Sequence, residues 1–214
     1  MITKKRRFGV RYSLSLITFL ISLILSHSIG EIFYNSIDGT DFYRYFRYIE
    51  YFMGEIETPT REQGLFYFWI ISLFIKSSQN FYVSENWEFI YSTAIQLGNF
   101  VFYLVGILGL IYLLRSRKVP WEKIFLVLSV LNFFPPLFGG RLIMKPEILA
   151  FAFLPWIIVA IDNYLEKQNY FSLIYASLLL SIIATSKGTV ALITFVSLGI
   201  LYFSKINLFK LKNI

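Results

Sequence analysis

The 214-residue chain is 57% hydrophobic and 20% aromatic with only 15% charged residues, a composition that excludes an ordinary soluble domain. It has no Cys and a single His, which excludes a disulfide framework, a thiolate metal site and a multi-histidine metal centre. The formal net charge is +7, but the Lys and Arg residues form short clusters beside apolar runs, which is the pattern of membrane topology. We therefore expect an integral membrane protein that has no nucleic-acid partner.

The N-terminal segment predicts a signal anchor. The basic run Lys4–Arg7 precedes an apolar run from Tyr12 to Ser26, a pattern that signal peptides and uncleaved anchors share. No Ala-x-Ala cleavage site follows, and the apolar run is long for a signal peptide, so we expect an uncleaved helix with a cytoplasmic N-terminus. His27 lies near the outer end of this helix, where a lone histidine is most often a satisfied interfacial residue.

A long region, about residues 30–88, follows and holds nine of the thirteen acidic residues. After Asp41, apolar residues recur at steps of three and four, which predicts an amphipathic helix lying in the membrane interface. Its apolar positions are Phe42, Tyr45, Phe46, Ile49, Phe52 and Met53. Thr58-Pro59-Thr60 ends this pattern, and residues 63–75 predict a second, more apolar helix that lies flat or dips into the bilayer. We expect two juxtamembrane helices in this loop.

The run Leu65–Ile75 is too short to cross a membrane alone. As a helix, its eleven residues would cover about 16 Å of a bilayer core about 30 Å thick. The positive-inside rule points the same way, because 13 of the 20 Lys and Arg residues lie inside if this run does not cross, and only 9 if it does. We therefore predict that it does not span.

Five further apolar stretches predict membrane-spanning helices. They cover about Ile90–Leu114, Ile124–Phe138, Ile148–Ile161, Tyr170–Ser186 and Thr189–Phe203. The expected fold is all-α: a polytopic membrane helical bundle of about six transmembrane helices, forming a single transmembrane domain over residues 1–214. Its first outer loop covers about residues 30–88 and contains the two juxtamembrane helices.

Asp38 and Asp41 follow the first predicted span, and carboxylates beside a bilayer are costly unless they are solvated, paired or used. The structural explanations are a turn at Asp38-Gly39 and a helix N-cap at Asp41. The functional explanation is a general base, since a carboxylate beside an acceptor hydroxyl can take its proton as a leaving group departs. Two Asp at this spacing also suit a divalent cation, although nothing else in the loop completes such a site.

A second set of charged residues is predicted on the same outer side. Arg141 and Lys145 precede an apolar stretch, and Pro146 with Glu147 suits the first turn of a helix. Together with Lys187 of the next outer turn, the cations could bind a phosphate or pyrophosphate at the membrane surface. The structural explanations are a plain helix start around Lys145 and a snorkelling side chain at Lys187.

These elements together resemble the GT-C superfamily of membrane glycosyltransferases. The resemblance lies in an N-in first helix, an acidic residue heading a juxtamembrane helix, the segment Gln63-Gly64-Leu65-Phe66-Tyr67, and Arg141 with Lys145-Pro146-Glu147 before a span. It implies sugar transfer from a polyprenyl-phosphate or polyprenyl-pyrophosphate donor to a glycan, lipid or protein acceptor on the outer face. By resemblance, Asp41 or Asp38 acts as the base. The residues that would bind the substrate are Arg141, Lys145, Glu147 and Lys187.

GT-C members usually have more helices, so a GT-C relative of this length is expected to be a fragment or a truncated form.

Three other interpretations stay open. Gly39-Thr40-Asp41-Phe42, with Glu62 before Leu65-Phe66-Tyr67, also resembles polysaccharide polymerases of the exopolysaccharide type, which use the same lipid carriers. A non-catalytic membrane subunit and a transporter are the remaining alternatives. Few ionisable residues near mid-membrane and the lack of an internal repeat argue against the transporter.

Overall fold

The computed structural model describes residues 2–33, 36–37, 42–57, 64–81 and 86–212, and every regular element in these ranges is an α-helix. The prediction of an all-α protein is confirmed for this part of the chain. In chain order the helices are α1 (Ile2–Phe33), α2 (Phe42–Met53), α3 (Phe66–Phe81), α4 (Trp87–Ser116), α5 (Trp121–Leu131), α6 (Pro135–Leu142), α7 (Ile148–Lys167), α8 (Tyr170–Ala184) and α9 (Gly188–Lys212).

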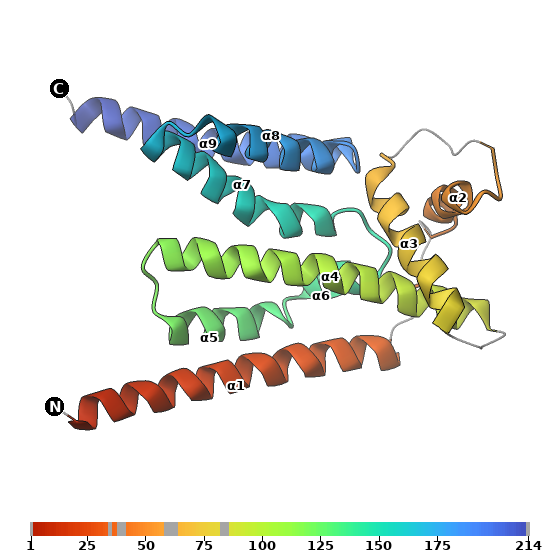
Figure 1. The fold of residues 1–214 in the computed structure, drawn as a ribbon, viewed down its shortest axis with the longest axis horizontal. Helices are drawn as coiled ribbons and strands as arrows, with labels where there is room; N and C mark the ends of the chain where they lie inside the picture. Colours follow the sequence, from red (N-terminus) through yellow and green to blue (C-terminus); the bar gives the residue numbers. More distant parts are fainter. Residues whose placement is uncertain (1, 34–35, 38–41, 58–63, 82–85, 213–214) are drawn as a thin grey trace.

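The long helices lie side by side, with the start of α1 and the end of α9 at one end of the bundle and α2 and α3 at the other (Figure 1). α4 is the central helix, because it packs against α3, α6 and α7. α1 packs against α5, and α8 packs between α7 and α9. This arrangement gives the molecule two polar ends, which we call the terminal end and the α2–α3 end.

Three helical segments are long and apolar enough to cross a membrane: Val10–Phe33, Trp87–Ser116 and Ile148–Lys167. α5 and α6 pass the same test only as a pair, so the described residues contain three to four candidate spans. α8 and the segment Gly188–Phe203 are apolar but shorter. The prediction of several membrane-spanning helices is therefore confirmed for three to four of them, by length and composition.

The apolar stretch at 124–138 differs from its prediction, which was one continuous span. α5 ends at Leu131, α6 begins at Pro135, and the two helices are bent by 63°. Pro135 and Pro136 have no backbone N–H, and a proline disfavours helical geometry in the residue before it. Phe134 accordingly has extended backbone angles, and α6 starts anew with its prolines in the first turn.

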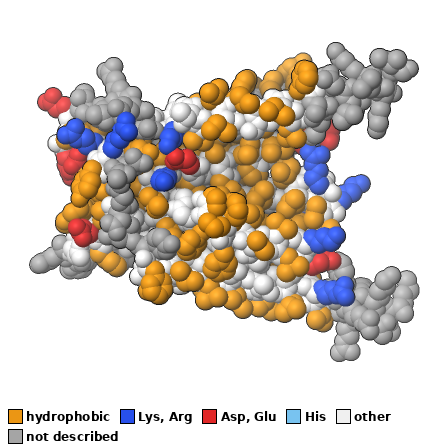
Figure 2. All heavy atoms as spheres, turned by 180° about the vertical axis from the view of Figure 1, so that it is seen from behind, with side chains coloured by type: hydrophobic (Ala, Val, Ile, Leu, Met, Phe, Trp, Pro, Cys, Tyr) orange, Lys and Arg blue, Asp and Glu red, His pale blue; other side chains and the backbone are white. Residues whose placement is uncertain are grey.

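Side-chain type changes along the bundle axis. Figure 2 shows hydrophobic side chains over the middle of one face, with Lys, Arg, Asp and Glu gathered at its two ends. In the middle, large apolar side chains such as Ile193 and Ile200 of α9 are more than two-thirds exposed. Such a surface is unfavourable in water and suits the hydrocarbon core of a bilayer.

α2 buries its apolar face against α3. Phe42, Tyr45, Tyr48 and Ile49 are buried, and the ring of Tyr48 stacks on that of Phe68 at a centroid distance of 4.7 Å. The helix predicted after Asp41 is therefore confirmed, but protein covers much of its apolar face. The location of α2 in the membrane interface stays a prediction.

Glycine at position 64 lets the start of α3 touch the turn between α8 and α9. The Gly64 N–H donates to the Ser186 carbonyl oxygen at 3.1 Å. A Cβ atom at this position would lie 1.7 Å from the Thr185 carbonyl oxygen, so no larger residue fits without moving one backbone away from the other. Segments far apart in the sequence are thus joined at the α2–α3 end.

Candidate functional site

Arg141 lies inside the protein. It is the next-to-last residue of α6, and its side chain is 1% exposed. The sequence predicted a cation that binds phosphate at the membrane surface; this role stays a prediction, and the structure adds that the side chain is enclosed by protein. This enclosure arises because the break after α5 turns the short α6 in against α1, α4 and α7.

The Arg141 guanidinium is surrounded by aromatic rings. Its central carbon lies 4.9 Å from the ring centroid of Tyr103, 5.4 Å from that of Phe138 and 6.0 Å from that of Phe100. Tyr103 is held in place because its hydroxyl donates to the Asn132 side chain at 2.7 Å. Cation–π contacts stabilise a guanidinium through its faces and leave its N–H groups available for an acceptor.

Nε and both terminal nitrogens of Arg141 are buried and have no hydrogen-bond partner in the part of the chain that the structure describes. A buried charge without a partner costs several kcal/mol, which is why buried arginines are normally paired. The described residues thus contain a cation whose counter-ion they do not supply.

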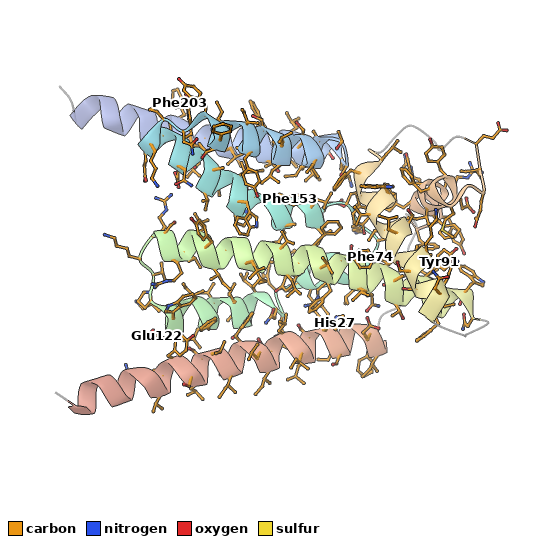
Figure 3. All side chains as sticks on the ribbon, viewed as in Figure 1. His27, Phe74, Tyr91, Glu122, Phe153 and Phe203 are labelled. Atoms are coloured by element: carbon orange, nitrogen blue, oxygen red, sulfur yellow. The ribbon has the colours of Figure 1, made fainter. Side chains whose placement is uncertain are left out.

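His27 of α1 lies next to this cluster, on the side of α1 that faces α4 (Figure 3). Its ring stacks on Phe100 with a centroid distance of 4.3 Å and an interplanar angle of 20°. Nε2 lies 3.9 Å from the Glu31 carboxylate, and the buried Nδ1 has no hydrogen-bond partner among the described residues. Sequence reasoning assigned no function to this histidine, although Glu31 one helical turn later was a readable signal.

The backbone of α6 beside Arg141 borders open space. A Cβ atom built on Gly139 or Gly140 would meet no other atom within 4 Å. Glycines of this kind allow a ligand to approach the backbone closely. On the other side, Leu142 is fixed, because its carbonyl oxygen accepts a short hydrogen bond from the Ser36 hydroxyl.

The structure joins two of the other predicted binding residues to each other. Lys187 Nζ donates to Glu147 Oε1 at 2.5 Å, at the N-terminal end of α7. Burial alone would lower the Lys187 pKa, but the Glu147 carboxylate outweighs this and raises it above its ordinary value. Lys187 therefore remains charged and is already partnered.

Lys145 and Glu147 also form a helix start, as the structural explanation predicted. The Lys145 and Pro146 carbonyls accept from the first backbone amides of α7, Ile148 and Leu149. The Lys145 side chain is half-buried and makes no hydrogen bond or ion pair with other described residues. Among the described residues, Lys145 therefore has no side-chain partner.

Buried hydrogen bonds hold the link between α6 and α7, residues 143–147, in place. The Tyr67 hydroxyl donates to Asn99 Oδ1 at 2.7 Å, and Asn99 Nδ2 donates to the Ile143 carbonyl at 2.8 Å. Burial raises the pKa of Tyr67 well above its ordinary value, although its hydrogen bonds with Asn99 and with the Lys145 backbone act the other way. Tyr67 is therefore a neutral hydrogen-bonding residue, not a base.

Asp38 and Asp41, the predicted base and its neighbour, lie outside the described residues. The chain on both sides of them is anchored: Ser36 binds the Leu142 carbonyl, and Phe42 is buried against α3. No group of three or more His, Asp or Glu residues that could hold a metal ion occurs within the described ranges. The suggested divalent-cation site at the two Asp stays a prediction.

Comparisons of the chain with family models, with curated proteins and with solved structures each return no match. The resemblance to GT-C glycosyltransferases therefore stays a hypothesis that the sequence motifs alone support.

Proposed function

We propose that the chain is a multi-pass membrane glycosyltransferase that moves a sugar from a polyprenyl-phosphate donor to an acceptor on the outer face. The observation that carries the proposal is Arg141, a buried guanidinium with no acidic partner among the described residues. A phosphate suits a guanidinium, which binds it through two parallel hydrogen bonds. The exposed hydrophobic side chains over the middle of the bundle would contact the polyprenyl tail.

In the proposed topology, α8 and α9 also cross the bilayer, which makes about six spans, and α2 and α3 are juxtamembrane. Along the sequence, 13 of the 20 Lys and Arg residues fall at the terminal end in this topology, so the positive-inside rule favours a cytoplasmic N-terminus. The thirteen are Lys4, Lys5, Arg6, Arg7, Arg11, Arg115, Arg117, Lys118, Lys123, Lys167, Lys205, Lys210 and Lys212. The α2–α3 end then faces outward.

The proposed reaction assigns Asp41 the role of base. An acceptor hydroxyl attacks the anomeric carbon, the bond from that carbon to the donor phosphate breaks, and the phosphate leaves with the bonding electrons. Asp41 takes the acceptor proton, with Asp38 as its neighbour or as a metal ligand. Supporting this assignment, the segment that carries both Asp follows Ser36, which binds the residue next to Arg141.

A transfer assay with a polyprenyl-phosphate-linked sugar in detergent micelles tests the proposal. We expect Asp41→Asn to bind donor normally but to lose about 10²- to 10⁴-fold in transfer rate, the usual contribution of a general base. Arg141→Met should lose donor binding, whereas Arg117→Met at the terminal end should keep it. Full transfer by Asp41→Asn would refute the base assignment.

One observation favours a second candidate, a non-catalytic membrane subunit. Lys187 and Glu147 neutralise each other, so two of the four predicted substrate-binding residues already have a structural role. If wild-type protein neither binds nor turns over any lipid-linked sugar, this candidate becomes the better account.

A further inference from the structure

Two unsatisfied buried polar groups contact one aromatic ring. The Arg141 guanidinium and the Nδ1 atom of His27 are both buried without a hydrogen-bond partner among the described residues, and both contact Phe100. They come from α6 and α1, helices that no sequence pattern connects. One unpartnered buried group is costly, and two beside each other indicate a ligand that is shared.

We propose that His27 belongs to the Arg141 site and that its protonated ring supplies a second positive charge to the same phosphate-type oxyanion, which makes binding proton-dependent. This inference rests on the proposed function only in taking the donor phosphate as the natural ligand. The open space beside Gly139 and Gly140 gives that ligand an approach to Arg141 along α6.

The chemistry of the imidazole explains why protonation is required. An ionised Glu31 carboxylate can only accept hydrogen bonds, so Nε2, which faces it, is expected to carry a proton. Nδ1 can then donate toward an anion only if the ring is doubly protonated, which a falling pH favours. In the low dielectric of a membrane protein, this second charge acts strongly on a nearby anion.

The charged and titratable groups around His27 set the direction of the effect. Among the described residues they are Glu31 on its own helix, Arg141 of α6 and, beneath the guanidinium, the Tyr103 phenol of α4. Burial and the Arg141 charge oppose a protonated ring, whereas the nearby Glu31 carboxylate favours it. An anion bound at Arg141 cancels the effect of the Arg141 charge, so ligand binding and proton binding must strengthen each other by the same factor.

Because His27 is the only histidine in the chain, its ring can be followed by NMR in the wild-type protein, produced without a histidine tag. Two probes that do not titrate between pH 5 and 8 are used: inorganic sulfate and a short-chain prenyl phosphodiester-linked sugar. We expect saturating probe to raise the midpoint of the His27 titration by about one pH unit, and the affinity to rise about tenfold from pH 8 to pH 5.5. In Arg141→Met, the probe should leave the His27 titration unchanged.

Further variants and outcomes separate this inference from the proposed function. In His27→Gln, binding should become independent of pH. If a probe binds through Arg141 but the His27 midpoint does not move, the inference is overturned and the Arg141 site stands. If neither probe binds wild-type protein, both are overturned. Probe binding with a shifted His27 titration but no sugar transfer supports the inference and refutes the proposed function.

The two probes distinguish the source of the anion. Sulfate that binds as tightly as the prenyl compound indicates a site for a free anion, whereas binding of the prenyl compound alone indicates a lipid phosphate. Either result supports the shared site, provided that the His27 titration shifts with it.

Discussion

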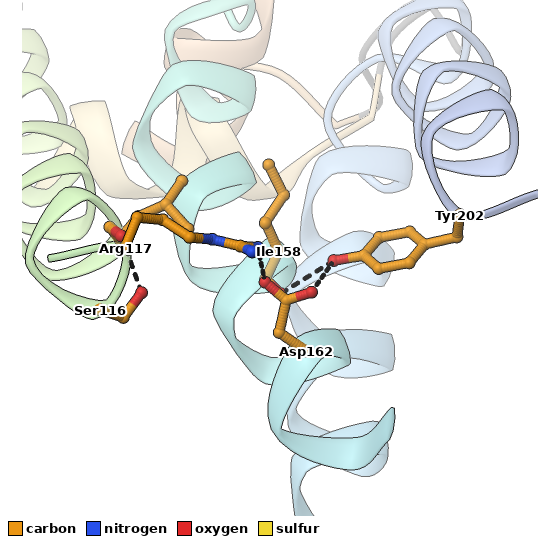
Figure 4. A network of polar contacts seen from close by, with 6 residues as sticks. Ser116, Arg117, Ile158, Asp162 and Tyr202 are labelled. Carbon is orange, nitrogen blue, oxygen red and sulfur yellow. Dashed lines mark hydrogen bonds and ion pairs between the residues drawn. The ribbon is translucent and has the colours of Figure 1, made fainter. Parts of the chain in front are cut away.

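An exposed arginine at the terminal end and a buried arginine in the bundle have opposite surroundings. At the terminal end, Arg117 forms a short ion pair with Asp162, and the Tyr202 hydroxyl also contacts that carboxylate, at 3.1 Å (Figure 4). Toward the α2–α3 end, Arg141 is more deeply buried, and aromatic rings contact its guanidinium. One arginine has its counter-ion within the fold, and the other has none among the described residues.

This difference separates a structural cation from a candidate binding cation. The Arg117–Asp162–Tyr202 contacts join α4, α7 and α9, and no ligand is needed to satisfy them. Arg141 gains cation–π stabilisation but keeps its N–H groups free, so the fold bears the cost of a charge that something else must balance. The α2–α3 end is therefore the end at which a ligand would stabilise the protein most.

The largest effect is expected from Gly64→Ala, which tests how the α2–α3 end is held together. The new methyl group would overlap the Thr185 carbonyl and break the hydrogen bond from Gly64 to Ser186. We expect a loss of about 2 to 3 kcal/mol in the free energy of unfolding, measured by thermal denaturation in detergent. Gly188→Ala is the matched control, because its methyl group meets no atom within 4 Å. Equal stability of both variants would contradict the close contact.

The next prediction compares the two arginines directly. Arg117→Met leaves the mostly buried Asp162 carboxylate with the Tyr202 hydroxyl but without its cation, so we expect a loss of about 1 kcal/mol in stability. Arg141→Met replaces a buried unpaired charge with an apolar side chain of similar length. Without ligand, its stability should stay equal to that of the wild type or rise.

The test is whether Arg141→Met raises or lowers the free energy of unfolding. The double variant Asp162→Asn with Arg117→Met is the control for the paired arginine. A marked destabilisation by Arg141→Met in ligand-free protein would mean that Arg141 is already satisfied within the fold. The contrast between the two ends would then disappear, and with it the main support for a binding site.

Local patterns in the sequence predicted much of the fold. Apolar steps of three and four residues marked α2, and continuous apolar stretches marked α4, α7, α8 and α9. The pair Pro135-Pro136 explains the bend between α5 and α6, but the stretch around it is so apolar that composition alone suggested one span. Hydropathy reports how apolar a stretch is, and it does not register a missing backbone hydrogen bond.

The site itself could be predicted only as a set of residues. Glu147 and Lys187 are forty positions apart, and the aromatic rings around Arg141 come from both α4 and α6. Such contacts depend on helix packing, which periodicity does not determine. The sequence placed Arg141, Lys145 and Lys187 on one side of the membrane, but it could not distinguish a free cation from a paired one.

The smallest effect concerns the Lys187–Glu147 ion pair, which is partnered like Arg117 but lies at the α2–α3 end. The folded-state pKa of Lys187 is raised, so its contribution to stability is fully present below the unfolded pKa of about 10.4 and is lost as the pH rises through the folded value. We expect a coupling of at most about 1 kcal/mol at pH 8 in a double-mutant cycle of Lys187→Met and Glu147→Gln, decreasing above about pH 10.4. A coupling that persists at high pH would show that Lys187 acts through packing rather than charge, and the pair would then no longer resemble Arg117 and Asp162.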